Sequence, residues 1–489
     1  MVETDAPRSG LSGGARPGLL IAGLSFVVLT VAVLQTAVVP VLGIIAHQLN
    51  ASTVSVSWAV TANLLAAAAA TPLIGRLADL HSKKHVLLTV LVVVLAGSVL
   101  AATTSSLALL ILARVLQAAS YGLYPISIAI LREELPEDRM GSAMSVLSGT
   151  LGFGGGTGLV VVGLLMSGSA GYHRVFWLTT GFTVAVIAIA VLVVPARTRS
   201  STGSIDWLGA AGLAAGLSAV LLAITQGHSW GWTAPATLAC AVCGLVFLGG
   251  WWFWERRVKQ PLVSIEMMTR RAIMLTNLAT VFVGMGLYFA FLGLTQFVQI
   301  PHAAAGYGFG ATVLEASVVY LLPGALTGFL VALVSGRFID RFGARPVLVV
   351  AAVAGIVGFL FIAFEHSAQW QIIAASILAN AYISLGYGAL PALVVAEVDA
   401  GETGVATSLN AIARTVGSSM AAAVVAVLLG RTIPDTRLPV ESSFVAIFIG
   451  GAATAALAMV LIALTRPRAG AIESVEARYE SRAMNHEWG

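Results

Sequence analysis

The residues of this chain that could do chemistry are a few polar side chains inside long apolar runs. Arg114 and Gln117 are three residues apart, and Asn410 and Arg414 are four apart, so each pair would share one helix face. Of the 22 Asp and Glu residues, Glu315 alone falls inside a run, about one turn from its end. Polar groups within a membrane are energetically costly and usually face a cavity, where they can bind a ligand or carry a proton. The candidates for a cavity or coupling role are Gln35, Asn63, Arg114, Gln117, Glu315, Asn410 and Arg414.

Each candidate also has a structural interpretation, and both remain open. The guanidinium of Arg114 could bond backbone carbonyls and Gln117 and so lock helices together, and Arg414 could do the same. Single Asn and Gln residues join helices more often than they contact ligands. Glu315 could be a helix-start acid stabilised by the helix dipole.

Catalytic and cofactor motifs are missing from the sequence. The glycine-rich stretch "LGFGGGTG" at 151–158 follows no strand and lies in an apolar run, which indicates close helix packing rather than a nucleotide loop. Cys240 and Cys243 have no other Cys or His nearby, so we expect small buried thiols and not a metal pair. We therefore expect no enzyme, metal or cofactor. The net charge of +4 comes from short basic clusters between apolar runs, which disfavours nucleic acid as a partner.

The elements that must position these residues are membrane-spanning helices. Of 489 residues, 58% are hydrophobic and 10% charged, against about 25% charged in a soluble domain. A helix crosses a bilayer with about 20 apolar residues. The sequence predicts an all-α polytopic protein embedded in a lipid bilayer, with fourteen spans at 19–45, 56–74, 86–103, 107–131, 141–166, 174–194, 207–226, 235–254, 272–298, 312–335, 346–364, 370–396, 404–430 and 442–464.

The distribution of Lys and Arg predicts the orientation. If both termini are cytoplasmic, 21 of the 26 Lys and Arg residues fall on the cytoplasmic side, 3 fall outside and 2 lie within spans. This asymmetry is a strong positive-inside signal. The nearest alternative is twelve spans, without 207–226 and 235–254, because omitting two spans together leaves both termini on the same side of the membrane.

One polar motif occurs twice. "GRLADLHSKKH" at 75–85 and "GRFIDRFGARP" at 336–346 both read Gly-Arg-x-x-Asp before a basic cluster. We expect each in a cytoplasmic loop after the second span of six, once spans 7 and 8 are set aside, which indicates two parallel halves. Asp could accept hydrogen bonds from a helix N-terminus or an Arg. The expected organisation is an N-terminal tail (1–18), a six-helix bundle (19–196), a linker with a two-helix insert (197–256), a second bundle (257–465) and a C-terminal tail (466–489).

These motifs resemble the loop signature of the major facilitator superfamily, and fourteen spans resemble its drug:proton antiporter branch. "LARVLQAAS" and "SLNAIARTVGSSM" are similar to its spans 4 and 13. The resemblance implies a conformational clamp made of Gly75, Arg76, Asp79, Lys83, Lys84, Gly336, Arg337, Asp340, Arg341 and Arg345. The chain has Leu80 where the family has Arg, so we expect Asp340 to matter more than Asp79. Gln35 replaces a common Asp and the fifth span lacks the antiporter proline, which puts proton antiport in doubt.

The resemblance implies a secondary transporter of the inner, or plasma, membrane that exports small amphipathic compounds by alternating access, with protons as the candidate coupling ion. We expect a monomer. With two Arg residues and no midplane acid, neutral or anionic compounds should be preferred over cations. The alternatives are uptake or facilitated exchange of a metabolite and, from another class, a membrane sensor or scaffold.

Overall fold

The computed structural model describes residues 17–38, 41–166, 171–197, 203–434, 436 and 438–465. Within these ranges there are fourteen helices long and apolar enough to cross a membrane, as the sequence predicts, and the secondary structure other than helix is one isolated bridge between Thr432 and Pro439. Because lipid offers no partners for backbone N–H and C=O groups, an apolar chain satisfies them within helices. The predicted tails at 1–18 and 466–489 lie almost wholly outside the described residues.

The spans are formed by long helices, and two of them are composite. They are α1 (Pro17–Thr36), α3 (Thr53–Leu80), α4 (Lys83–Thr103), α5 with η2 and α6 (Leu107–Gln117, Ala118–Gly122 and Leu123–Glu134), α7 (Glu137–Leu165), α8 (His173–Val193), α9 (Trp207–Trp230), α10 (Pro235–Glu255), α12 (Arg271–Gln299), η3 with α15 (Ala316–Leu321 and Leu322–Phe342), α16 (Ala344–Phe364), α17 (Gln369–Ala396), α18 (Thr403–Leu429) and α19 (Glu441–Leu464). Short helices complete the order: α2 (Leu42–Gln48), α11 (Ile265–Thr269), α13 (His302–Ala305), α14 (Val313–Glu315) and η4 (Ala400–Glu402).

Irregular turns interrupt two spans just before a proline. The 3₁₀ turn η2 precedes Pro125, and the π-helical turn η3 precedes Pro323. A proline has no N–H and its ring meets the carbonyl four residues earlier, so the preceding turn tightens or widens. The first predicted span, 19–45, is also divided: α1 ends at Thr36, and the separate α2 begins at Leu42.

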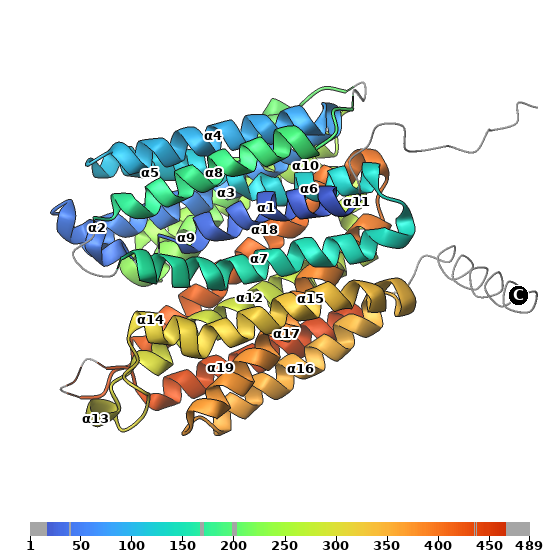
Figure 1. Ribbon diagram of the computed structural model, residues 1–489. Helices are drawn as coiled ribbons and strands as arrows, with labels where there is room; N and C mark the ends of the chain where they lie inside the picture. Colours follow the sequence, from blue (N-terminus) through green and yellow to red (C-terminus); the bar gives the residue numbers. More distant parts are fainter. Residues whose placement is uncertain are drawn as a thin grey trace, which may run out of the picture.

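The long helices form two groups that meet along one seam (Figure 1). Helices α1 to α8 make one group, and α12 and α15 to α19 make the other. At the seam α7 packs on α15 and α17, while α18 packs on α3 and α6. The core therefore includes side chains from both groups.

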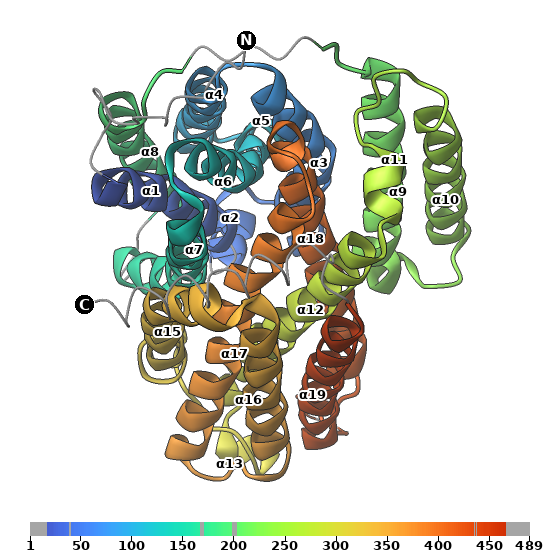
Figure 2. The same ribbon diagram turned by 90° about the vertical axis from the view of Figure 1, so that its right-hand side faces the viewer.

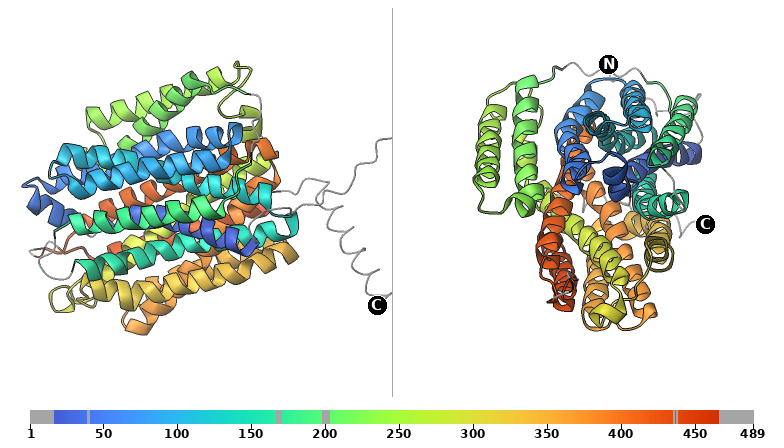
Figure 3. Two further views of the ribbon diagram at one scale, coloured as in Figure 1. Left: turned by 45° about the horizontal axis from the view of Figure 1, so that its top comes forward. Right: turned by 90° about the vertical axis from the view of Figure 1, so that its left-hand side faces the viewer.

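Helices α9 and α10 stand outside both groups, as Figure 2 and both views of Figure 3 show. Helix α9 packs on α3, where the Gln226 amide donates to the Thr61 hydroxyl at 3.1 Å, and it also packs on α18. Helix α10 contacts mainly α9 and exposes apolar side chains such as Leu245 and Val246. The pair is thus attached beside the seam.

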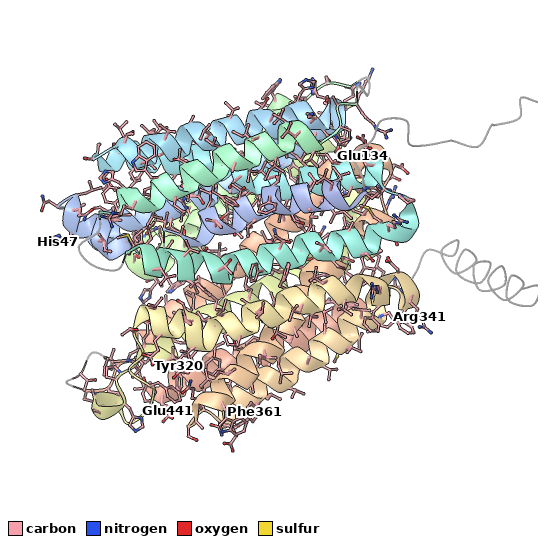
Figure 4. All side chains as sticks on the ribbon, in the orientation of Figure 1. His47, Glu134, Tyr320, Arg341, Phe361 and Glu441 are labelled. Atoms are coloured by element: carbon pink, nitrogen blue, oxygen red, sulfur yellow. The ribbon has the colours of Figure 1, made fainter. Side chains whose placement is uncertain are left out.

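The two ends of the molecule differ in charge. Figure 4 shows Glu134 and Arg341 at one end and His47, Tyr320 and Glu441 at the other. We call the first the basic end, because both Gly-Arg motifs lie there. The sequence predicted that both motifs lie in loops, and this prediction is wrong, because both motifs form helix ends. Asp79 is in the last turns of α3, Lys83 begins α4, and Asp340 is near the end of α15. The turn between α15 and α16 is a single residue, Gly343, with φ of +83°.

Candidate functional site

A cavity lies between the two helix groups, with walls from α1, α3, α7, α12, α15, α17, α18 and the irregular turns η2 and η3. Water-sized molecules could occupy about 160 Å³ of it. Its apolar wall includes Leu64, Leu287 and Phe291. Its polar lining residues are Gln35, Thr36, Tyr121, Tyr288, Asn380, Ser384, Tyr387, Arg414, Thr415 and Ser418. Such a mixture of apolar wall and few polar groups suits a small amphipathic molecule.

Arg414 is the charged residue that lines this cavity; its wall contains no Asp, Glu, Lys or His among the described residues. The guanidinium carbon lies 4.7 Å from the ring centroid of Tyr387 and 5.2 Å from that of Tyr124. At these distances each aromatic face attracts the cation. Arg414 is 11 residues into α18, about 16 Å from the start of that helix at the basic end. It therefore sits near the middle of the membrane-spanning region.

The structure separates Arg114 from the cavity. Its side chain is 1% exposed and donates to the carbonyls of Leu34 (3.2 Å) and Ala59 (3.3 Å) and to the side-chain oxygen of Gln117 (2.7 Å). Gln117 in turn donates to Ser98. These bonds join α1, α3, α4 and α5, which is the helix-locking arrangement that the sequence left as an alternative.

The two asparagine candidates also hold helices together. The Asn63 amide donates to the Arg114 carbonyl at 2.7 Å. The Asn410 amide donates to Asn277 at 2.9 Å and to Thr280 at 2.8 Å, and so joins α18 to α12. Both side chains are buried, and neither lines the cavity.

Of the remaining candidates, Gln35 lines the cavity and Glu315 does not. Glu315 ends the three-residue helix α14, its side chain is exposed, and its N–H donates to the Thr312 hydroxyl. The structure therefore does not bring Glu315 together with Arg114 or Arg414. The sequence reasoning missed Tyr121, Tyr288 and Phe291 in the cavity wall, because an aromatic residue in an apolar run looks the same whether it faces a core or a cavity.

At the basic end, Asp79 joins the two helix groups. Its two carboxylate oxygens each accept a hydrogen bond of 2.9 Å, from the N–H groups of Gly404 and Val405. Those are orphan donors in the first turn of α18, where the helix dipole also favours a negative charge. Asp79 is 6% exposed, so this helix cap is shielded from water.

Asp340 makes the corresponding contact from the other group. Its carboxylate accepts from the Ser142 hydroxyl of α7 at 2.7 Å, and Asp340 is exposed. The second copy of the motif is closer to the family pattern, yet its acid is the more exposed of the two. This difference in burial makes the opposite order, with Asp79 more important than Asp340, an alternative to the expected one.

The motif glycines allow the helices at these two crossings to touch. A Cβ on Gly75 would overlap the Ser408 hydroxyl and would lie 2.6 Å from the Gly404 carbonyl oxygen. A Cβ on Gly336 would overlap the backbone of Ser142. A real Cβ does not fit at such separations, so glycine is required for α3 to meet α18 and for α15 to meet α7.

The basic residues of the predicted clamp mostly do not bridge the groups. Lys83 pairs with Glu133, and Lys84 donates to the Val191 carbonyl, both within the first group. Arg337 and Arg341 are exposed, and Arg341 lies over the Phe342 ring. Arg76 and Arg345 are partly buried, and the Arg76 Nε has no hydrogen-bond partner.

A residue absent from the predicted clamp does bridge them. Arg132, at the end of α6, donates to the carbonyls of Val398 (2.7 Å) and Asp399 (3.2 Å) and to the Thr403 hydroxyl (2.5 Å). Nothing in its sequence surroundings distinguished it from an ordinary helix-end arginine. With Asp79 and Asp340 it closes the seam between the cavity and the basic end.

Comparison with known proteins places this architecture in a family. The model of the Major Facilitator Superfamily matches residues 24–207, 206–422 and 327–482. An uncharacterized MFS-type transporter of Mycobacterium tuberculosis is 29% identical over 462 residues, which are 90% of this chain and 65% of that protein. The tetracenomycin C resistance and export protein of Streptomyces glaucescens is 28% identical over 447 residues, 88% of this chain and 78% of that protein.

A solved structure shares the fold. The crystal structure of the human organic anion transporter MFSD10 superimposes with a TM-score of 0.62 at 15% identity, over 91% of this chain and 99% of that one. At this identity the likeness concerns the fold alone. Since the family model covers nearly the whole described chain, this multi-pass membrane protein belongs to the major facilitator superfamily.

Proposed function

We propose that the chain is a secondary transporter that exports small amphipathic molecules by alternating access. The observation that carries the proposal is a cavity between two helix groups whose seam is closed on one side by Asp79, Asp340 and Arg132. The family is one of membrane transporters, so transport is the activity to expect rather than an enzyme reaction. The export function of the Streptomyces relative supports efflux. The chain spans 65% of the length of the mycobacterial relative.

We infer the orientation of the chain in the membrane from its charge asymmetry. The basic end is cytoplasmic in this proposal, since 21 Lys and Arg residues fall on that side of the sequence map. Both termini are then cytoplasmic, and the conformation described here is closed toward the cytoplasm. Residues 19–196 and 257–465 would rock against each other, with the insert 197–256 carried beside the seam. A single copy contains the complete cavity, which supports a monomer as the working unit.

Proton coupling is supported less well than transport. A proton carrier in the cavity would be a carboxylate or a histidine, and the described cavity wall has neither. Glu315, the coupling candidate of the sequence, lies exposed at the end opposite to the clamp. The acid-free cavity therefore favours facilitated exchange of a metabolite as the second candidate function.

Transport by the purified full-length chain in proteoliposomes distinguishes these possibilities. The assay measures movement of a panel of neutral, anionic and cationic aromatic compounds, with and without an imposed pH gradient. Efflux that depends on the gradient supports export by antiport, and exchange that is indifferent to it supports the second candidate. Failure of every compound to move, with protein shown to be folded and inserted, would contradict the transport proposal.

A further inference from the structure

The charge of Arg414 has no counter-ion among the residues that the structure describes. The described residues form three ion pairs, Lys83–Glu133, Arg197–Glu134 and His366–Glu441, and none includes Arg414. In the same part of the chain, no backbone carbonyl accepts from its guanidinium, and the polar groups that interact with its charge belong to Tyr121, Tyr124 and Tyr387. The guanidinium carbon lies over the rings of Tyr124 and Tyr387, and Arg414 lines the cavity, so its N–H groups are available to a molecule in the cavity.

Arg114 shows what the same side chain does when its role is structural. Arg114 is 1% exposed and donates to three protein oxygens, whereas Arg414 is only partly buried and has no such set of acceptors. An arginine inside a membrane protein is costly unless it finds partners. Among the described residues, the partners that Arg114 finds have no counterpart around Arg414, and the adjoining space is a cavity.

We propose that Arg414 binds the anionic group of the transported molecule, so that the cavity selects small aromatic anions. This inference rests on the proposed transport function and names its substrate class. A guanidinium presents paired N–H donors that match the two oxygens of a carboxylate or sulfonate. Since the described wall of the cavity has no second charge of either sign, a cation finds no carboxylate there, and an anion finds one fixed donor.

The rest of the cavity defines the other half of the ligand. Leu287 and Phe291 from one side and Leu64 and Leu151 from the other supply an apolar wall next to the charged site. The accessible space of about 160 Å³ is close to that of an engineered protein cavity of about 150 Å³ that binds benzene. The cavity therefore has room for at least one ring with an anionic substituent in this conformation.

The test uses three compounds of similar shape and different charge: benzenesulfonate, benzenesulfonamide and benzamidinium. Benzenesulfonate stays ionised at working pH, so it does not leak through lipid as a neutral acid. Binding to the purified full-length protein is measured by titration calorimetry, and transport is measured in proteoliposomes. We expect the wild type to prefer the sulfonate over the sulfonamide by at least roughly tenfold, and to bind the cation least.

The variants isolate the charge of Arg414. Arg414→Gln should weaken sulfonate binding by roughly tenfold to a hundredfold, because the charge-assisted bond to the anion is lost. Binding of the neutral sulfonamide, which does not make that bond, should stay within about threefold. Arg414→Lys should keep part of the preference as a point charge. Arg431→Gln, which removes a positive charge just beyond the far end of α18, is the matched control and should change neither affinity.

The outcomes separate this inference from the transport proposal. Transport of sulfonamide or benzamidinium equal to or better than sulfonate in the wild type would overturn the inference and leave transport standing. An unchanged sulfonate preference in Arg414→Gln would likewise overturn it. If none of the three compounds binds or moves while other members of the broader panel do, the assigned ligand class is wrong. If no compound of any kind moves, the transport proposal itself fails.

Discussion

At the scale of single residues, two arginines in similar sequence surroundings have different environments. Both stand in apolar runs beside an amide residue, at i+3 for Arg114 and i−4 for Arg414. The sequence therefore offered the same two interpretations for each. The structure distinguishes them through carbonyls of residues far away in the chain, Leu34 and Ala59, whose approach depends on how α1 and α3 pack. Such acceptors cannot be located from spacing within one helix.

We predict that Arg114→Gln lowers the free energy of unfolding by roughly 2 kcal/mol, because three interhelical or side-chain bonds are lost at about 0.6 kcal/mol each. Equilibrium unfolding of the purified protein in mixed micelles measures this. Arg414→Gln serves as the comparison and should be destabilised by less, since the Arg414 guanidinium donates to no carbonyl of the described residues. A fully stable Arg114→Gln would show that these bonds do not hold the helices.

At the scale of elements, the two Gly-Arg motifs act as helix ends that join opposite groups. The sequence predicted their location between spans and the acceptor role of the acids. It ranked Asp340 above Asp79 from the family pattern, because the burial that distinguishes the two acids cannot be read from the sequence: Asp79 is 6% exposed and caps two amides, while Asp340 is exposed. The bridging by Arg132 was missed for the same reason, since two of its acceptors are backbone carbonyls in the connection between α17 and α18.

We predict that Asp79→Asn opens the basic end more than Asp340→Asn does. Losing charge-assisted bonds worth about 1.5–3 kcal/mol each should shift the closed-to-open ratio by at least tenfold, against a few-fold for Asp340→Asn. Spin labels at positions 81 and 342, in a background without Cys240 and Cys243, report the distance across the seam by double electron–electron resonance spectroscopy. Equal distance distributions in both variants would contradict the ranking.

We predict that Gly75→Ala separates α3 from α18, because the added methyl would lie 2.6 Å from the backbone oxygen of Gly404, which cannot rotate away. The same pair of spin labels should show a longer distance at the basic end. Gly181→Ala is the control, since a Cβ at Gly181 has no neighbouring atom within 4 Å. A closed basic end in Gly75→Ala would mean that the crossing tolerates a side chain and that glycine is not required there.

At the scale of the whole molecule, the fold was the part most fully predictable. The count of fourteen spans followed from run length alone, and the two added helices α9 and α10 were anticipated where the motif repeat left two spans unassigned. The cavity could not be predicted in the same way. Its wall is assembled from nine elements, and the residues that line it, such as Tyr121 and Tyr288, differ from core residues only in what they face.

We predict the orientation of the whole chain from its charge. In a background without Cys240 and Cys243, a membrane-impermeant thiol reagent applied to intact cells should modify a cysteine at exposed position 302 and spare cysteines at positions 82 and 343. The reason is the excess of Lys and Arg at the basic end, which retains that end in the cytoplasm. Permeabilised cells provide the control, in which position 343 should react. Labelling of position 343 in intact cells would mean that the basic end faces outward and would contradict the predicted orientation.

The cap formed by Asp79 has a consequence for how the protein responds to ionic strength. Mobile ions weaken interactions between exposed charges over about 10 Å at 0.1 M salt, but act little on buried contacts. The Asp79 contact across the seam joins a carboxylate to backbone amides in a site that is 6% exposed, so dissolved salt cannot readily screen it. The closed conformation should therefore persist when the salt concentration at the basic end rises, whereas a seam held by exposed lysine–glutamate pairs would loosen.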